Sequence, residues 1–210
     1  MSLSVGFATG LYGISFGAIA AAAGLTLVEI AALSLLMFSG ASQFAFVGIV
    51  ASGGGFGAAI SSSWLLGVRN GFYALRLAPL IGPAGLHKLL AAQLTIDESN
   101  AVSAAQPNDR LGRLGFWLTG AAVFVFWNLM TIAGGLLGSQ LGNPSDWGLD
   151  AAAAAAFLAL LWPRLRPSRY RLLALFAGLA TALLIPQLPL GVPILLAALL
   201  ALLPAFWEKP

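Results

Sequence analysis

The sequence predicts an all-helical membrane protein that crosses the bilayer seven or eight times and forms a single transmembrane domain over residues 1–210. Hydrophobic residues make up 60% of the chain and charged residues only 8%, whereas soluble domains carry about 25% charged residues. Several apolar runs are long enough to cross the hydrocarbon core as helices, which rise about 1.5 Å per residue. The basic residues cluster in short connectors between these runs, which indicates membrane topology rather than nucleic-acid binding.

The first apolar run, residues 3–23, predicts a retained membrane helix rather than a cleaved signal peptide, because it lacks a preceding positive region and another apolar run follows at once. A glycine stripe on one helical face lets a neighbouring backbone approach closely in lipid. We therefore expect close helix packing along the face that is formed by Gly6, Gly10, Gly13, Gly17 and Gly24.

The second run, residues 25–50, is interrupted in its middle by consecutive polar residues. Hydroxyl and carboxamide groups are costly in hydrocarbon unless partners satisfy them, so these groups must face other helices or a wet cavity. The alternative is a packing seam across which the glutamine is hydrogen-bonded. We interpret the segment as the lining of a substrate path that is formed by Ser39, Gly40, Ser42, Gln43 and Phe44. At the start of this run, Thr26 and Glu29 have the spacing of a capping box.

The third run, residues 58–83, contains three further candidates, Arg69, Asn70 and Tyr73, together with a second arginine, Arg76. Its two arginines and its tyrosine are spaced by four and three residues and therefore share one helical face. An arginine at mid-membrane costs at least about 2.5–3.5 kcal/mol, so two lipid-facing arginines are implausible. Either the helix is broken near Gly67 and Gly71 and its arginines face the protein interior, or Arg76 reaches back to an interface.

Residues 86–105 form an amphipathic segment that contains the neighbouring acids Asp97 and Glu98. A cytoplasmic helix lying on the membrane surface would have this pattern. The alternative is a fourth span or a re-entrant helix that offers its carboxylates to Arg69 or Arg76, or to a proton. Because carboxylates within membrane proteins are ordinarily ion or proton sites, Asp97 and Glu98 are our candidates for proton coupling.

The run over residues 114–138 predicts a further span that contains the candidate Trp127 and a small polar patch formed by Asn128 and Thr131. More spans are expected over residues 149–162, 172–185 and 190–206. The connector from Arg164 to Arg171 contains four arginines, so the positive-inside rule places this connector and the C-terminus in the cytoplasm.

Several classes of protein are excluded by what the chain lacks. It has no cysteine and a single histidine, His87, so we expect neither a thiolate site nor a multi-histidine metal site, and no cofactor. The glycine-rich segment 52–57 is not followed by the lysine of a phosphate-binding loop, and no metalloprotease motif is present. We expect the protein not to be an enzyme.

Taken together, these segments resemble the AzlC family, the large subunit of bacterial branched-chain amino-acid exporters. The segments that carry the resemblance are Ile14–Gly17, Ser39–Phe44, Arg69–Tyr73, Asp97–Glu98 after Thr95, and then Trp127, Thr131 and Leu149–Asp150. The chain departs from the family pattern at Ser15, where proline is frequent, and at Gly67 and Asn70, where asparagine and histidine are frequent. These departures concern the identity of the substrate more than the fold.

The resemblance implies a proton-driven permease of the bacterial inner membrane that exports branched-chain or similar apolar amino acids with a small AzlD-type membrane subunit. The substrate carboxylate would be bound by Arg69 or by free backbone N–H groups near Gly40 or Gly71. Its ammonium group would be bound by Gln43, Asn128 or Asp97, and its apolar side chain by Phe44, Phe72 and Trp127. The alternatives are an ion or proton channel and a permease for a different small solute.

Overall fold

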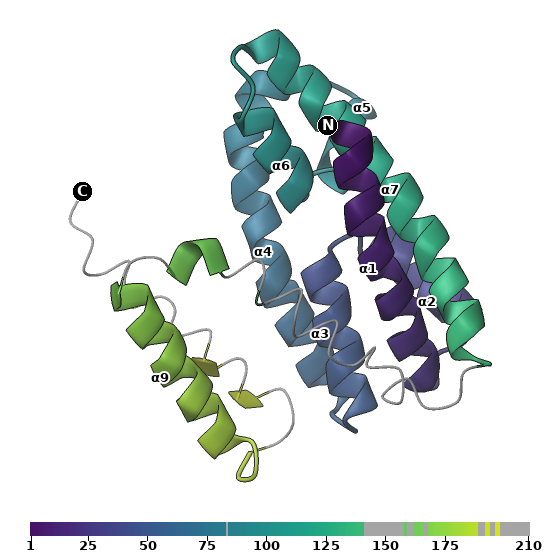
Figure 1. The fold of residues 1–210 in the computed structure, drawn as a ribbon, viewed down its shortest axis with the longest axis vertical. Coiled ribbons are helices and arrows are strands. Elements are labelled where there is room, and N and C mark those ends of the chain that lie inside the picture. The colour runs from purple at the N-terminus through teal and green to yellow at the C-terminus, as the bar shows by residue number, and fades with distance from the viewer. Residues whose placement is uncertain are drawn as a thin grey trace.

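A computed structural model describes residues 1–82, 84–140, 158, 162–165, 168–188, 192–193 and 196–197 of the chain, and the elements in these residues are helices (Figure 1). The predicted all-helical class is confirmed over this part of the chain. The helices are α1 (Ser2–Ala22), α2 (Leu27–Leu36), α3 (Gly40–Ala51), α4 (Phe56–Ile81), α5 (His87–Gln93), α6 (Asp97–Ala104), α7 (Asp109–Gly138), the short 3-10 helix η2 (Trp162–Leu165) and α9 (Ser168–Leu184).

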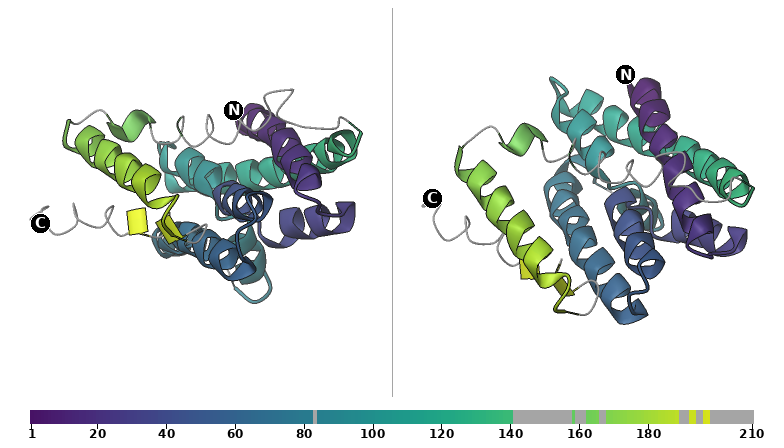
Figure 2. Two further views of the ribbon diagram at one scale, coloured as in Figure 1. Left: turned by 90° about the horizontal axis from the view of Figure 1, so that it is seen from below. Right: turned by 60° about the horizontal axis from the view of Figure 1, so that its bottom comes forward.

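The pair formed by α1 and α7 is the centre of the fold, and α2, α3 and α6 pack around it (Figures 1 and 2). These two helices are long and apolar enough to cross a membrane. The predicted glycine face of α1 is confirmed for Gly6, Gly10, Gly13 and Gly17, which all lie against the backbone or side chains of α7. The expectation that Gly24 belongs to this face is wrong. Gly24 lies beyond the end of α1 with a φ of +86° and has no neighbour within 4 Å of the position of a Cβ.

The run over residues 25–50 is not one helix, which corrects the expectation of a continuous span. It is divided into α2 and α3 by the non-helical residues 37–39. The break frees carbonyl groups at the end of α2, and two glutamine side chains satisfy some of them. Gln43 donates from Nε2 to the carbonyls of Leu33 and Met37, at 3.1 and 2.9 Å, and Gln93 donates to Leu35 at 2.7 Å. The predicted capping box at the start of α2 is confirmed.

The fully buried Gln43 side chain gives a first prediction about stability. Replacing Gln43 by alanine removes the donor to both carbonyls at the end of α2. Because an unsatisfied buried polar group costs about 1–3 kcal/mol, we expect the purified Gln43→Ala protein to unfold at a lower temperature than the wild type. Thermal unfolding in detergent checks this, and Ser52→Ala, which removes an exposed helix-end hydroxyl, is the matched control. An unchanged melting temperature for Gln43→Ala would show that the amide does not hold the break.

Helix α4 is continuous from Phe56 to Ile81, so the expectation of a break near Gly67 and Gly71 is wrong. It ends at Gly82, which adopts a left-handed conformation with a φ of +57°. Arg69 is half-buried and faces the protein, whereas Arg76 is exposed. The broken helix of this protein is therefore the α2–α3 segment rather than α4.

The segment over residues 86–105 is neither a single span nor a single surface helix. It forms the short helices α5 and α6, which are separated at residues 94–96, and α6 packs against α7. The expectation that this segment offers a carboxylate to Arg69 is confirmed by an ion pair between Asp97 and Arg69.

The C-terminal expectations are tested only in part. Helix α9 corresponds to the run predicted over 172–185, and it lies at the edge of the molecule with none of its residues classed as buried (Figures 1 and 2). The predicted run 190–206 lies mostly outside the described residues, as does 149–162 with Asp150. In the arginine-rich connector, Arg166 also lies outside them.

Candidate functional site

A cavity of about 280 Å³ lies where the first turns of α3 and α6 meet α1, α4 and α7. Helices α4 and α7 line the cavity near the middle of each helix, at Arg69–Asn70 and at Val123–Trp127. Its volume is at the lower end of the range for small-molecule sites, which suits a small solute. Its described lining consists of Thr9, Tyr12, Phe38, Ser39, Gly40, Ala41, Phe44, Arg69, Asn70, Ile96, Asp97, Glu98, Val123 and Trp127.

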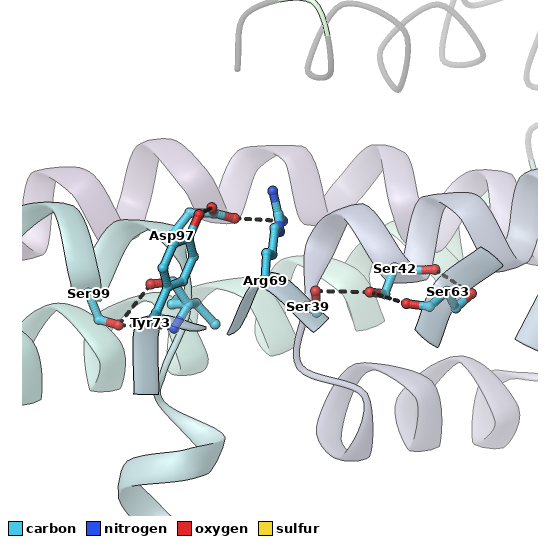
Figure 3. Close-up of polar contacts among 8 residues, drawn as sticks. Ser39, Ser42, Ser63, Arg69, Tyr73, Asp97 and Ser99 are labelled. Atoms are coloured by element: carbon cyan, nitrogen blue, oxygen red, sulfur yellow. Dashed lines mark hydrogen bonds and ion pairs between the residues drawn. The ribbon is translucent and has the colours of Figure 1, made fainter. Parts of the chain in front are cut away.

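The charged side of the cavity is built around Arg69. Its guanidinium Nη2 lies 2.6 Å from Oδ2 of Asp97, and the hydroxyl of Tyr73 donates to Oδ1 of the same carboxylate at 2.8 Å (Figure 3). Asp97 is thus held by a cation and a neutral donor, both from α4. Both side chains of the ion pair are partly accessible, at 31% and 26% exposure, so a solute in the cavity can reach them.

Glu98 is the second carboxylate of this wall, and it lines the cavity together with Thr9 of α1. Two adjacent acids therefore line the cavity opposite a single guanidinium group, that of Arg69. Because both groups are carboxylates, this wall favours a ligand cation.

The start of α3 contributes backbone donors to the cavity. Ser39 is the N-cap of α3, and no side chain caps the helix, so the first N–H groups of α3 have no partner within the helix. The hydroxyl of Ser39 accepts a hydrogen bond from Ser42 at 3.1 Å. At Gly40, a Cβ atom would lie 3.1 Å from the Trp127 ring, so the glycine leaves the backbone close to the indole.

Three polar atoms of the cavity residues are buried and have no hydrogen-bond partner among the described residues. They are Nε of Arg69, Oδ1 of Asn70 and Nε1 of Trp127. Because these three atoms have almost no accessible surface, a ligand in the cavity would reach them only after the surrounding side chains move.

The aromatic and aliphatic residues of the lining form an apolar side of the cavity. The rings of Phe16, Phe44 and Trp127 contact one another at centroid distances of 5.7 to 6.3 Å. Phe38 packs edge-on against Phe124 at 5.0 Å. The buried side chains of Ile96 and Val123 complete this side. The arrangement provides charged groups for one end of a ligand and an aromatic surface for the other.

The structure thus brings eight of the thirteen predicted site residues to one cavity, Ser39, Gly40, Phe44, Arg69, Asn70, Asp97, Glu98 and Trp127. Of the remaining five, Tyr73 lies next to the cavity, where it holds Asp97. Ser42 joins α3 to α4 through reciprocal hydrogen bonds with Ser63, as in the packing-seam alternative (Figure 3). Gln43 holds the α2–α3 break, as described above.

The last two, Asn128 and Thr131, lie on α7 away from the described lining of the cavity. Asn128 donates from Nδ2 to the carbonyl of Phe124 at 2.7 Å. Thr131 is fully buried at the contact between α1 and α7, beside Gly13 and Gly17. Neither side chain is placed to bind a ligand in this cavity.

Sequence reasoning missed six lining residues, Thr9, Tyr12, Phe38, Ala41, Ile96 and Val123. Thr9 and Tyr12 had a usable signal, since they are polar, lie three residues apart and share a face in a largely apolar helix. The other four are apolar side chains in apolar surroundings, and nothing in the sequence distinguishes them from ordinary core.

Comparison with known proteins gives one match. A family model described as AzlC protein matches residues 4–141, which include all the residues that line the cavity. No curated protein and no solved structure matches the chain.

Proposed function

Because the chain belongs to the AzlC family, which is associated with branched-chain amino-acid transport, we propose that it is a secondary-active exporter of branched-chain or related apolar amino acids. The observation that carries this proposal is the cavity, which has a cation, two carboxylates and an aromatic wall within one small volume. An apolar amino acid requires these three kinds of partner. The same family membership favours a transporter over an enzyme.

The carboxylate of the substrate would bind between Arg69 and the start of α3. Arginine binds carboxylates through parallel hydrogen bonds, and free N–H groups at a helix N-terminus favour an anion. Broken helices in transporters present such ends to anionic substrate groups. Here Ser39, Gly40 and Arg69 line the same cavity.

The ammonium group would bind to the acidic wall, where the carboxylates of Asp97 and Glu98 are the acceptors. The ion pair between Arg69 and Asp97 has the charge pattern of a zwitterion. An entering amino acid would replace this pair with two new pairs, one on each of its own charged groups. The exchange leaves neither protein charge unpaired, which avoids the main cost of separating buried ions.

Coupling to protons would use the same acidic wall. Asp97 is paired with Arg69, and protonation of Asp97 or Glu98 would weaken the binding of the ammonium group. A proton entering from one side of the membrane would therefore promote release of the substrate. Asp97 and Glu98 are our candidates for this step.

We further propose that the protein spans the inner membrane several times, with the Arg164–Arg171 connector in the cytoplasm, and that it works with a small AzlD-type subunit. Helix α4 has 26 residues, which is long enough to span, and its arginine at mid-length faces the cavity instead of lipid. The exposed apolar side chains of α4, among them Trp64 and Phe72, would then face lipid or a partner.

The alternatives are a channel for ions or protons, or a permease for another small solute. Export from cells that are loaded with leucine-, isoleucine-, valine- and methionine-containing dipeptides tests the proposal. We expect export that requires a co-expressed small partner and collapses when a protonophore is added. An export rate that does not change when the protonophore is added would contradict proton coupling. The absence of export of any of these amino acids, with and without the partner, would favour one of the alternatives.

A further inference from the structure

A second cavity of about 350 Å³ adjoins the first, on the other side of the α2–α3 break. Three residues line both cavities, Phe38, Ser39 and Asn70. Along α4 the second cavity extends from Asn70 back to Ile60, which is ten residues or about 15 Å of helix toward the start of α4. The two cavities therefore lie on either side of a thin wall that consists of Phe38, Ser39 and Asn70.

The lining of the second cavity differs in charge from that of the first. Its described residues include no Asp, Glu, Lys or Arg, and its polar groups are neutral hydroxyls and amides such as those of Ser63, Gln93 and Thr95. A zwitterion in this cavity would have hydrogen-bond partners but no ionic partner. Hydrogen bonds to neutral groups are weaker than those to charged groups, so the second cavity is the weaker binding site.

The wall between the cavities includes two residues of the non-helical segment between α2 and α3. Phe38 lies in the non-helical break, and its backbone makes none of the hydrogen bonds that begin or end α2 and α3, whereas the carbonyl of Ser39 accepts the first hydrogen bond of α3 from Gln43. Neighbouring groups fix the ends of the break, because Gln43 holds the carbonyls of Leu33 and Met37, and Ser42 ties the start of α3 to α4. Asn70 lines both cavities, so the same residue is next to a ligand in either of them.

We propose that the second cavity is the low-affinity end of the substrate route, which the amino acid enters from the first cavity when the Phe38–Ser39 wall is displaced. This inference rests on the proposed function. A transported solute must bind well enough to enter and weakly enough to leave, and a charged cavity followed by a neutral one meets both needs.

Gly67 gives a direct test, because it lines the second cavity and is absent from the described lining of the first. A Cβ at Gly67 would lie 3.6 Å from Oγ of Ser42, so a small side chain fits there and a longer one extends into the cavity. The chain has no cysteine, so Gly67→Cys provides a single labelling site. Gly71→Cys, on the same helix with open space around it and outside both cavities, is the matched control.

We expect a bulky methanethiosulfonate reagent on Gly67→Cys to reduce leucine transport in proteoliposomes at least tenfold. The Kd for leucine of the same labelled protein should change less than twofold, and labelled Gly71→Cys should transport normally. Gly67→Leu should show the same separation of binding from transport without any reagent.

Full transport by Gly67→Leu, or by Gly67→Cys after complete labelling verified by mass, would overturn the route. Loss of binding together with transport would overturn the separation of the two cavities. If the unlabelled protein does not bind leucine at all, the proposed function itself fails, which is a different result from a failure of the route alone.

Discussion

Replacing Arg69 by glutamine is expected to reduce leucine export by about 10- to 150-fold. The guanidinium would supply charge-assisted hydrogen bonds to the substrate carboxylate, and such bonds contribute about 1.5–3 kcal/mol. At about 1.4 kcal/mol for each factor of ten, their loss gives the stated range. The substitution also leaves Asp97 without its cation, so the acidic wall of the cavity would repel the carboxylate. Initial export rates at matched expression levels measure the effect.

Arg76→Gln is the matched control for this experiment. Arg76 lies on the same helix, is exposed, and does not belong to the described lining of the cavity. We expect its export rate to stay within twofold of the wild type. Arg69→Lys should fall between the two, because lysine keeps the charge but not the planar pair of donors. Equal export by Arg69→Gln and the wild type would exclude Arg69 from substrate binding.

Replacing Gly17 by alanine is expected to have the largest effect on stability. The added methyl group would overlap the carbonyl oxygen of Thr131 and the amide nitrogen of Gly135 on α7, and backbone atoms cannot rotate away. Helices α1 and α7 would have to separate along the central contact of the fold. Overpacking of this kind costs about 1–3 kcal/mol and occasionally more.

Thermal unfolding in detergent measures this loss, and we expect the Gly17→Ala protein to melt at least about 2 °C lower than the wild type. Gly48→Ala is the control, because no atom lies within 4 Å of the position of the new methyl group. Alanine favours a helix over glycine, so this variant should be equal to the wild type or slightly more stable. Equal melting of Gly17→Ala and Gly48→Ala would contradict the close contact between α1 and α7.

The sequence allowed some parts of this fold to be predicted for clear physical reasons. The glycine face of α1 follows from the spacing of four glycines, and the start of α2 follows from the capping box of Thr26 and Glu29. Arg69 was expected to face the protein because its charge is too costly in lipid, and it lies at the cavity. These predictions depend on local patterns or on a large energetic penalty, and both are visible in one sequence.

The position of the helix break was not predictable in the same way. The glycines that flank Arg69 suggested a break in α4, yet nothing around Gly71 demands one and the helix continues. The actual break before Gly40 depends on tertiary partners, since Gln93 comes from a distant segment to satisfy a carbonyl of α2. The sequence also does not show that the break is there for Gln43 to stabilise, so Gln43 is interpreted as a substrate ligand. In the structure its amide donates to the carbonyls of Leu33 and Met37 at the break.

Competition by leucine analogues in counterflow is the measurement that tests the central claim most directly, namely that the cavity at Arg69 binds an amino acid through its carboxylate. Purified protein in liposomes loaded with leucine is given labelled leucine, with an excess of either leucinamide or unlabelled leucine outside. We predict that leucine competes and that leucinamide, which lacks the carboxylate, does not. Equal competition by both compounds would show that the carboxylate is not recognised, and would contradict the assignment of Arg69.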